Sequence, residues 1–469
     1  MLNAVPMIIS EKNFPQVFSF AETNSVLAKN LYNAALFRLR QVFTGWDKPH
    51  RSENEQQVFA EIETAERVYP GLKVRRVLTY HALEKILRAN RNPDFFAGLP
   101  MQTAQHIVRE AADKFREWLD SLKGYQKDPS GYTGKPRMPK YLKGLRHTFE
   151  VTNQDAALYP ADGAEGCALK LPGFRKNERI PLGYVSPAMD LRHMKFKPFH
   201  GRYIMTFVVE NMAPPVFPDM PFLAGLDFGV DNTAAIACTD GSSAVCKGGA
   251  VLSANRLYAK KKAEAVSLIT KGHSHIKAES AYLDSLAVKH ECFLKDQLHR
   301  ISMEVIRFCM QHRAGTLVIG VNRLWKQHSC MGKQNNQNFV SVPYGRLKDM
   351  ILYKALCAGI SVIEQEESYT SRADVTAGDA MPVYGKEKAQ PVFSGKRLER
   401  GLYLCSHGYC INADCNGAAN ILRKAFPQAW DSTQDFHFLG RPQSIGFHAL
   451  NPAPVPKKSV QRRSVGSAC

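Results

Sequence analysis

Acidic residues at three places in the C-terminal half have a sequence context suited to holding a metal ion. Asp227 interrupts the apolar run LAGLDFGVDNTAAIACTDG, Glu366 and Glu367 lie near the end of the segment SVIEQEES, and Asp414 lies near the start of NADCNGAANILRKAF. A carboxylate in an apolar core is costly unless an opposite charge pairs with it. Carboxylates that meet on one sheet can hold a hard cation such as Mg²⁺. Two such ions, about 3.5–4 Å apart, promote phosphodiester hydrolysis.

Each acid alone also has an ordinary explanation. Asp227 precedes a glycine that could form a turn, and Asp414 could cap the N-terminus of a helix. The tripeptide D-F-G occurs in kinases too, but neither a glycine-rich phosphate loop nor an H-R-D segment accompanies it. No Gly-Lys pair is followed by Ser or Thr, so the Walker motif of ATPases is absent. The sequence therefore argues against kinases and P-loop ATPases.

The elements that must position these acids read as an α/β sheet from residue 222 onward. FLAGLDFG and TAAIACTDGSSAVCKGG predict consecutive antiparallel strands joined by tight turns. A helical hairpin is expected over 253–312, followed by a buried strand at GTLVIGVN and a helix at YGRLKDMILYKALCAGI. SVIEQEES predicts a further strand, and the segment beginning at residue 412 predicts a closing helix.

The N-terminal half reads differently. The first 20 residues are strand-like and lead into a helix over 28–43, on which Arg38 and Arg40 are expected to be exposed. Helical periodicity continues over 54–122, and short β-like pieces follow the Gly- and Pro-rich segment 123–147 up to about residue 212. The stretch after 427 is irregular and basic, and we expect it to be disordered.

Composition points to a polyanionic partner. The 469 residues carry a net charge of +19, with a pI near 9.4, which favours nucleic acid. No apolar run approaches the roughly 20 residues of a membrane span, and a signal peptide is not evident. The 11 cysteines are scattered and odd in number, which is typical of a reducing compartment. We expect a cytoplasmic, nucleoid-associated protein without a membrane partner.

Basic residues interleaved with aromatics predict the surfaces that contact nucleic acid, although a solvated loop is the alternative. The densest such stretch lies within 123–147, and Lys195 and Lys197 belong to a second patch. The predicted contact residues are Arg38, Arg40, Tyr132, Lys135, Arg137, Lys140, Tyr141, Lys143, Arg146, Lys195 and Lys197.

Several motifs together resemble the TnpB (transposon-encoded OrfB) family of RNA-guided DNA endonucleases, which are related to type V CRISPR effectors. GLDFGVDNTAAI, YTS and NADCNGAANIL are similar to the nuclease motifs of that family, and GKPRMPKY and YNAALFRLRQVF to its N-terminal segments. The resemblance covers roughly residues 10–425. It implies a RuvC-like, RNase-H-type nuclease domain, Mg²⁺ or Mn²⁺ as a pair of ions, a guide RNA from the transposon end, and a double-stranded DNA target. The transposase of the same element is a further possible partner.

Carried over by position, Asp227 matches the first RuvC aspartate and Asp414 the last. The middle glutamate of the family usually ends the strand equivalent to TLVIG, where this chain has Gly320. Some members resemble this chain in supplying the acid from the strand before Y-T-S. Because neighbouring strand residues face opposite sides, only one of Glu366 and Glu367 can point into the site, and we favour Glu367 over Glu366 as the third catalytic and Mg²⁺-binding residue.

The resemblance fails for zinc. Relatives often carry two Cys-x-x-Cys pairs, but residues 371–404 of this chain contain neither Cys nor His. Cys405 and Cys410 remain as weak candidates whose spacing does not suit a zinc ribbon. We therefore expect that zinc is not bound.

The sequence thus predicts a multidomain α+β protein with a β-barrel-like, wedge-like nucleic-acid-binding domain at 1–30 and 123–220 and a helical recognition subdomain at 31–122. The nuclease domain is expected at 221–365 and 366–425, with a degenerate zinc-ribbon-like insert at about 372–410, and the disordered tail at 426–469. The expected activity is cleavage of guide-matched DNA beside a short flanking motif. A cleavage-deficient RNA-guided repressor and a transposon DNA-strand transferase remain as alternatives, the first because of Gly320.

Overall fold

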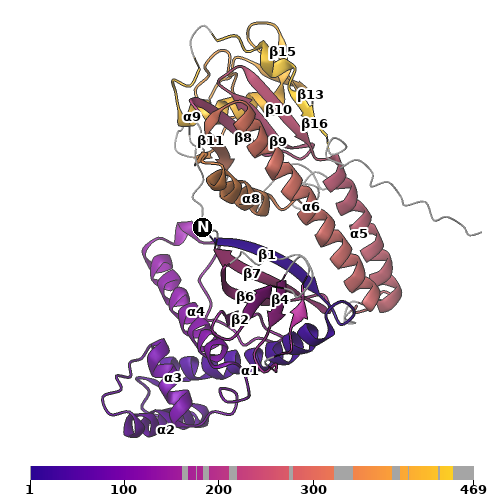
Figure 1. Ribbon diagram of the computed structural model, residues 1–469. Coiled ribbons are helices and arrows are strands. Elements are labelled where there is room, and N and C mark those ends of the chain that lie inside the picture. Colours follow the sequence, from indigo (N-terminus) through magenta and orange to yellow (C-terminus); the bar gives the residue numbers. More distant parts are fainter. Residues whose placement is uncertain are drawn as a thin grey trace, which may run out of the picture. The chain divides into compact units, whose positions relative to one another are not determined.

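The chain divides into two compact units, Met1–Pro214 and Pro215–Cys469. The computed structural model describes residues 2–160, 167–175, 177–182, 190–210, 219–273, 278–321, 342–382, 391–399, 401–430 and 434–446. Its fold is a multidomain mixture of helices and sheets (Figure 1). No helix in these ranges is both long and apolar enough to cross a membrane.

The first unit is built on an antiparallel sheet with the strand order β1-β7-β6-β2. The strands are β1 (Leu2–Ile9), β2 (Phe149–Thr152), β6 (Asp190–Phe199) and β7 (Arg202–Glu210). In β7 every second residue is buried, which is the alternation expected when one face of a sheet covers a core. A smaller sheet contains β3 (Ala157–Pro160), β4 (Cys167–Lys170) and β5 (Ile180–Pro181).

The helices of this unit are α1 (Pro15–Gly45), α2 (Glu53–Val68), α3 (Tyr80–Ala89) and α4 (Met101–Lys127), followed by the short 3₁₀ helix η1 (Pro129–Gly131). Helix α1 begins well before the expected residue 28 and runs unbroken through the boundary expected between residues 30 and 31. Pro15 lies in its first turn, where a missing N–H costs nothing. One continuous hydrophobic core joins residues from these helices and from the sheet.

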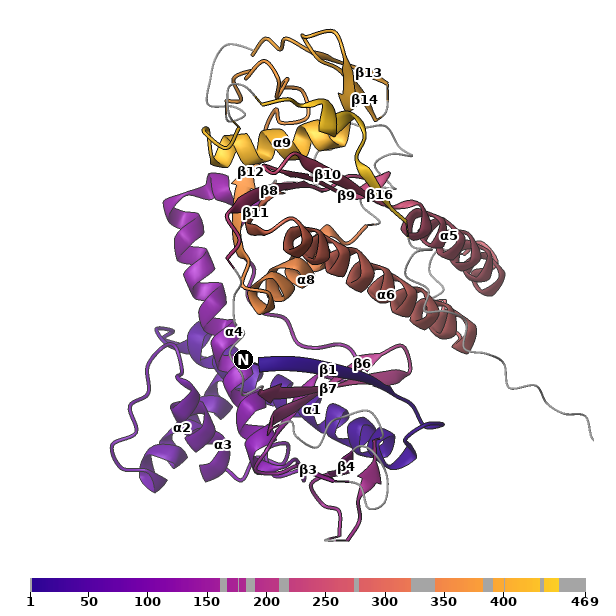
Figure 2. The ribbon, with the colours of Figure 1, turned by 45° about the horizontal axis from the view of Figure 1, so that its top comes forward.

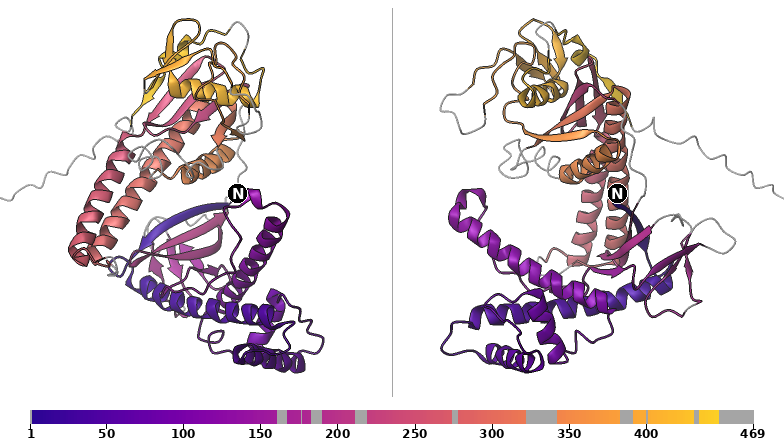
Figure 3. Two further views of the ribbon diagram at one scale, coloured as in Figure 1. Left: turned by 180° about the vertical axis from the view of Figure 1, so that it is seen from behind. Right: turned by 60° about the vertical axis from the view of Figure 1, so that its left-hand side comes forward.

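The second unit contains a six-stranded sheet in the order β12-β11-β8-β9-β10-β16. Strands β8 (Phe222–Asp227), β9 (Asn232–Cys238) and β10 (Ser242–Lys247) form the expected antiparallel meander. Strand β11 (Ala314–Val321) is parallel to β8, and β12 (Ser361–Glu366) is parallel to β11. The expected helical hairpin is formed by α5 (Gly249–Thr270) and α6 (Ala281–Gln311), which extends away from the sheet (Figure 3).

Helices cover both faces of this sheet. Helix α9 (Ala413–Ala425) lies on one face, while α6 and α8 (Tyr344–Cys357) lie on the other (Figure 2). Two separate hydrophobic clusters follow from this layering. Leu226 and Ile319 pack with α6 and α8, whereas Val318 packs with α9. Alternation along each strand therefore decides which residues face α9.

The residues after α9 correct one expectation, because residues 434–446 belong to the folded unit. The chain forms the 3₁₀ helix η2 (His437–Gly440) and then β16 (Gln443–Ile445), which pairs in parallel with β10. Trp430, Phe436 and Leu439 are buried against the α9 side of the sheet. The irregular sequence hid this strand because it is only three residues long. The part of the expected tail beyond residue 446 lies outside the described residues.

Candidate active site

Asp227 is the last residue of β8 and faces α9. Its neighbour Leu226 packs on the opposite side of the sheet, so Asp227 shares the α9 face with Gly225. Two glycines permit the close approach of helix and strand. A Cβ at Gly225 would lie 2.1 Å from the carbonyl oxygen of Ala418, and a Cβ at Gly417 would lie 2.5 Å from Asp227 Oδ2. Helix α9 therefore passes directly over the carboxylate of Asp227.

The turn after Asp227 is held from the opposite face of the sheet. The buried Tyr344 of α8 donates a hydrogen bond from its hydroxyl to the carbonyl oxygen of Gly229, at 2.8 Å. Its ring also packs against Phe228, with the ring centroids 5.8 Å apart. The D-F-G sequence thus serves as a fixed turn that presents Asp227 at the end of its strand.

Asp414 lies in the first turn of α9, but it is not the helix cap. The cap is Asn412, whose side-chain oxygen accepts from the backbone N–H groups of Asp414 and Cys415, both at 3.0 Å. The Asp414 carboxylate is therefore available to other partners. It accepts from Asn232 Nδ2 at 2.7 Å and lies 3.4 Å from the Arg397 guanidinium.

Glu367 follows directly after β12 and reaches across the adjacent strand β11. Its Oε2 lies 3.1 Å from the position that a Cβ on Gly320 would occupy. In the β11–β12 register, Gly320 pairs with Gln365. The absence of a side chain at Gly320 thus leaves the space that the Glu367 carboxylate approaches.

Glu366 has a different environment. Its carboxylate accepts from Lys424 Nζ of α9 at 2.7 Å and from the backbone N–H of Ser368, also at 2.7 Å. Burial alone would raise the pKa of Glu366, but these hydrogen bonds outweigh it and lower the pKa. Glu366 is the last residue of β12 and Glu367 lies outside the strand, so strict alternation does not separate them. Their surroundings distinguish them, because Glu366 pairs with Lys424, whereas the carboxylate of Glu367 lies beside Gly320.

Asp227, Glu367 and Asp414 interact electrostatically. The pKa of Asp227 is raised well above its ordinary value, first by burial and then by the negative charges of Glu367 and Asp414. Arg397 opposes this shift but does not overcome it. Solvent still reaches part of all three acids. Strand β8, the residue after β12 and helix α9 therefore place three acids near one another, where their negative charges exceed the positive charge of Arg397.

The donor set suits a divalent cation, although the acids are not drawn together around one. Among the residues that the structure describes, no three His, Cys, Asp or Glu side chains are gathered closely enough to hold a metal ion as they stand. Carboxylate oxygens are the ligands that Mg²⁺ prefers. The close approaches at Gly417 and Gly320 show that side chains there would crowd the carboxylates of Asp227 and Glu367. Sequence reasoning missed Asn232 and Arg397, because neither carries a motif.

The predicted basic surface requires one correction, at Arg38. Its side chain is buried and forms a two-pronged ion pair with Glu61 at 2.6 and 2.8 Å, so it cannot contact a nucleic acid. Arg40 is partly buried, donates to the carbonyl oxygen of Pro139 and stacks over Tyr141. Both arginines therefore fix protein segments.

All of the other predicted contact residues are exposed. These are Tyr132, Lys135, Arg137, Lys140, Tyr141, Lys143, Arg146, Lys195 and Lys197. Arg146 and Lys195 form ion pairs with Glu22 and Glu150, at 2.6 and 2.9 Å. Since both ion pairs are exposed, they are weak and do not prevent contact with a polyanion.

The insert between Glu367 and Asp414 is held together by a buried carboxylate. Asp374 is fully buried and accepts from the backbone N–H of Thr376 at 2.9 Å, from its hydroxyl at 2.7 Å, and from the N–H of Ser406 at 2.6 Å. Thr376 and Ser406 belong to two separate turns of the insert. Strand β14 (Leu402–Leu404) pairs with β13 (Lys396–Glu399) and with β15 (Cys410–Asn412). Cys405, directly after β14, is buried, and Cys410, the first residue of β15, is exposed.

Asparagines of α9 connect the same insert to the helix that carries Asp414. Asn416 accepts from the backbone N–H of Val375 at 3.2 Å and donates to the carbonyl oxygen of Ala373 at 2.8 Å. Asn420 donates to the carbonyl oxygens of Ala373 and Thr370, at 2.7 and 3.0 Å. The N-A-D-C-N-G-A-A-N sequence therefore fixes the insert on α9.

Two family models match the chain, mostly within the second unit; the first begins at the end of β7 in the first unit. The model described as "Probable transposase" (OrfB_IS605) matches residues 207–325, and the model described as "Cas12f1-like, TNB domain" matches residues 344–421. A curated relative, the TnpB-like protein ORF457 of Acidianus two-tailed virus, is 28% identical over 207 residues. That alignment covers 43% of this chain and 42% of the relative, which is less than half of its length.

A solved structure shares the fold over most of the chain. The chain resembles the protein in a cryo-EM structure of a Cas12f1–sgRNA–target DNA complex with a TM-score of 0.50 and 15% identity. The resemblance covers 88% of this chain and 84% of that protein. The mixed α/β, multidomain fold is therefore similar to that of Cas12 effectors. In sequence, the two family models and the curated relative make this chain similar, over part of its length, to TnpB (OrfB) proteins.

Proposed function

We propose that this chain is an RNA-guided endonuclease that cuts guide-matched double-stranded DNA beside a short flanking motif. The observation that carries the proposal is the electrostatic coupling of Asp227 to Glu367 and Asp414, which come from three different elements. The sequence similarity to TnpB proteins and the fold shared with a Cas12f1–sgRNA–target DNA complex support a guide RNA and a DNA target as partners. In such a division of labour, base pairing reads the sequence, and the protein reads duplex shape and the flanking motif.

Asp227, Glu367 and Asp414 are the residues that would hold Mg²⁺ or Mn²⁺. A pair of such ions supplies an activated water and stabilises the leaving oxygen in phosphodiester hydrolysis. Asn232 orients Asp414 through its 2.7 Å hydrogen bond. Arg397 lies 3.4 Å from Asp414 and would be available to pair with a DNA phosphate if that carboxylate held a cation.

Gly320 no longer favours the repressor alternative. The missing acid on β11 motivated that alternative, but the carboxylate of Glu367 approaches the same place from β12. We propose a RuvC-like, RNase-H-type arrangement for the second unit, which its β12-β11-β8-β9-β10 strand order supports. The β1-β7-β6-β2 sheet would serve as the wedge-like domain and α2 and α3 as part of the recognition subdomain.

The test is cleavage of a plasmid that carries a target matched to the RNA recovered with the protein. The RNA is sequenced first, and cutting is measured in Mg²⁺ and in Mn²⁺ with DNA binding measured in parallel. We expect one discrete RNA species and guide-dependent cutting. Guide-dependent binding without cutting in either metal would establish the repressor instead. Absence of a discrete RNA, with strand joining of transposon ends, would establish the transferase.

The exposed basic segment is tested separately. Replacing Lys135, Arg137 and Lys140 together by Gln should flatten the slope of log affinity for RNA against log salt by up to about 2–3 units, because each phosphate contact contributes close to one unit. Binding is measured by fluorescence anisotropy over a range of salt concentrations. An unchanged slope would place the RNA on another surface.

A further inference from the structure

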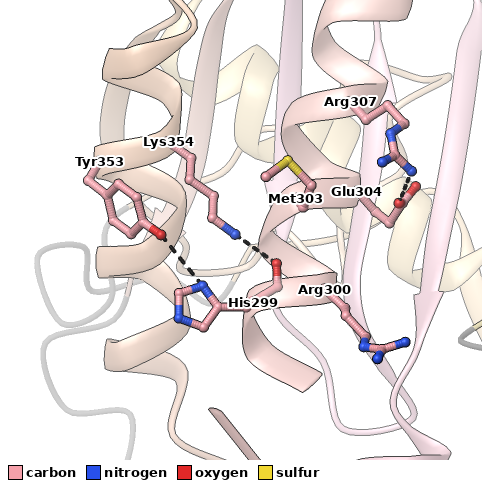
Figure 4. A pocket seen from close by; sticks show the side chains of 7 residues that line it. All are labelled: His299, Arg300, Met303, Glu304, Arg307, Tyr353 and Lys354. Carbon is pink, nitrogen blue, oxygen red and sulfur yellow. Dashed lines mark hydrogen bonds and ion pairs between the residues drawn. The ribbon is translucent and has the colours of Figure 1, made fainter. Parts of the chain in front are cut away.

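A pocket of about 380 Å³ opens between α6 and α8, and its lining is rich in cations (Figure 4). It is lined by His299, Arg300, Met303, Glu304, Arg307, Tyr353 and Lys354. These helices cover the face of the sheet opposite α9, so the pocket is separate from Asp227 and Asp414. The carboxylate chemistry does not account for it.

Lys354 is the unusual member of this lining because it is a buried cation without a carboxylate partner. Its side chain is buried, and its ammonium donates to the carbonyl oxygen of His299 and to the hydroxyl of Ser302, both at 2.7 Å. Among the described residues, no carboxylate forms an ion pair with Lys354. Two neutral acceptors leave one of its three N–H groups for another partner.

The charge around Lys354 remains positive after the internal pairs are counted. Glu304 pairs with Arg307, and Arg300 pairs with Asp296 at 2.8 Å. Burial lowers the pKa of Lys354 to about 8. Burial and the nearby Lys354 also lower the pKa of His299. A buried charge without a counter-ion is costly, so an anion in the pocket would relieve that cost.

We propose that this pocket binds a phosphate group of a nucleic-acid strand through Lys354, with Arg300 and Arg307 at its rim. Exposed Tyr353 and Met303 supply apolar surface beside the cations, which suits the sugar of the same nucleotide. Asp296 is half-exposed, so Arg300 can exchange it for phosphate at little cost. Glu304 is largely buried and keeps its pair with Arg307, whose partly exposed guanidinium has further N–H groups to offer a phosphate. The net charge of +19 favours a polyanion as the occupant.

The inference rests on the proposed function only in that the ligand is a nucleic acid, and its test involves no cleavage. Lys354→Met removes the charge but keeps the length of the side chain. Lys348→Met is the matched control, because it removes one positive charge from the same helix, where Lys348 pairs with Glu364 at 2.6 Å. Both full-length variants are first compared with the unmodified protein by circular dichroism and thermal melting.

Affinity for a short mixed-sequence single-stranded RNA, and for a DNA duplex of the same length, is then measured against salt without divalent ions. Lys354→Met should flatten the slope of log affinity against log salt by about 0.7 units for a single strand or about 0.9 for a duplex. The nucleic acid whose slope changes, single-stranded RNA or duplex DNA, is the one that binds in the pocket. Lys348→Met should leave both slopes unchanged. Equal changes in the two variants, or none in Lys354→Met, would overturn the proposal.

Amine acylation provides a second measurement that does not depend on a substitution. At pH 8 a lysine with a lowered pKa reacts more readily than an ordinary one, and mass spectrometry reports the modified residue. Saturating RNA or duplex should protect Lys354 and leave Lys348 reactive. Acylation of Lys354 at the same rate with and without either nucleic acid would make it a lysine that only joins α6 to α8, and would refute the phosphate site.

Discussion

Two carboxylates in the second unit, the partly buried Asp227 and the fully buried Asp374, are in opposite electrostatic states. Asp227, at the end of β8, has a pKa raised by burial and by the neighbouring Glu367 and Asp414. Asp374, in the insert, has a lowered pKa, since hydrogen bonds from Ser406 and Thr376 outweigh the effect of burial. The same chemical group is thus stabilised at one place by protein donors and left at the other among like charges. The comparison indicates that Asp374 has a structural role, and it supports the proposal that Asp227 binds a cation.

The largest expected effect is on cleavage. Replacing Asp227, Glu367 or Asp414 by Ala should lower the cleavage rate by at least about 100-fold, because even residues behind the ligands of a metal contribute 10–100-fold. Guide-dependent DNA binding should persist, since phosphate contacts and base pairing provide the affinity. Plasmid cutting and filter binding measure the two quantities.

Glu366→Ala is the matched control for this experiment, because it removes the adjacent acid, which pairs with Lys424. Its effect on cutting should be small. If Glu366→Ala abolishes cutting while Glu367→Ala does not, the assignment of the third acid is wrong.

The second largest effect is on the stability of the fold and concerns Asp374, the carboxylate whose hydrogen bonds come from Thr376 and Ser406. Asp374→Asn should lower the free energy of unfolding by about 2–4 kcal/mol, because the new amide cannot accept the Ser406 N–H and leaves a buried donor unsatisfied. Urea denaturation followed by circular dichroism measures the change. Asp435→Asn is the control, because Asp435 is exposed and its carboxylate accepts from nearby His437. Equal destabilisation by both substitutions would contradict the structural role of Asp374.

Because hydrogen bonds to Asp374 join two turns of the insert, we predict that the insert folds without zinc. Metal analysis of the pure protein should find well under one zinc per chain, and a chelator should leave the melting temperature unchanged. A stoichiometric zinc that disappears when Cys405 and Cys410 are replaced by Ser would refute this.

The folded pKa of Asp374 is lowered, so its stabilising contribution is present above the unfolded pKa of about 4 and is lost as the pH falls through the folded value.

A third change tests the space beside Glu367. A Cβ at Gly320 would lie 2.5 Å from Ile421 Cδ1 and 3.1 Å from Glu367 Oε2, so Gly320→Ala should cost about 1–3 kcal/mol of stability. It should also slow cleavage several-fold by displacing Glu367. Adding Ile421→Val removes the closest atom and should restore part of both losses.

Gly345→Ala on α8 is the matched glycine control, because a Cβ there meets nothing within 4 Å. Cleavage rate and melting temperature are measured for all four proteins. Unimpaired cutting by Gly320→Ala would show that the position of Glu367 does not depend on this glycine.

The smallest expected effect is a gain of stability. The folded pKa of Asp227 is raised, so its contribution to stability is full below the unfolded pKa and is lost as the pH rises through the folded value. Asp227→Asn should therefore raise the melting temperature at pH 7.5 without divalent ions by about 2–4 °C, the shift that roughly 1 kcal/mol produces in a domain of this size. Mg²⁺ should stabilise the unmodified protein but not the variant. A lower melting temperature for Asp227→Asn would show that the charged carboxylate of Asp227 stabilises the fold, contrary to the comparison with Asp374.

Local patterns predicted the sheet of the second unit because its strands, turns and helices have clear periodicity. The same patterns failed where a partner is remote in sequence. Arg38 lies beside the apolar stripe of α1, and only folding brings Glu61 of α2 against it. Asn412 and Asp414 are equally good caps by type, and the backbone geometry decides for Asn412. Asn232 and Arg397 became visible only when the fold brought them to Asp414.

The position of β16 at the edge of the sheet has a consequence during synthesis on the ribosome. Strand β10 ends at Lys247, and the strand that covers its outer edge begins at Gln443, about 200 residues later. At 5–20 residues per second, that edge stays open for about 10–40 s. An unpaired strand edge is a template for association with other chains. Over nearly the same interval α9 is still missing, so the nascent chain lacks Asp414 until shortly before its sheet is closed.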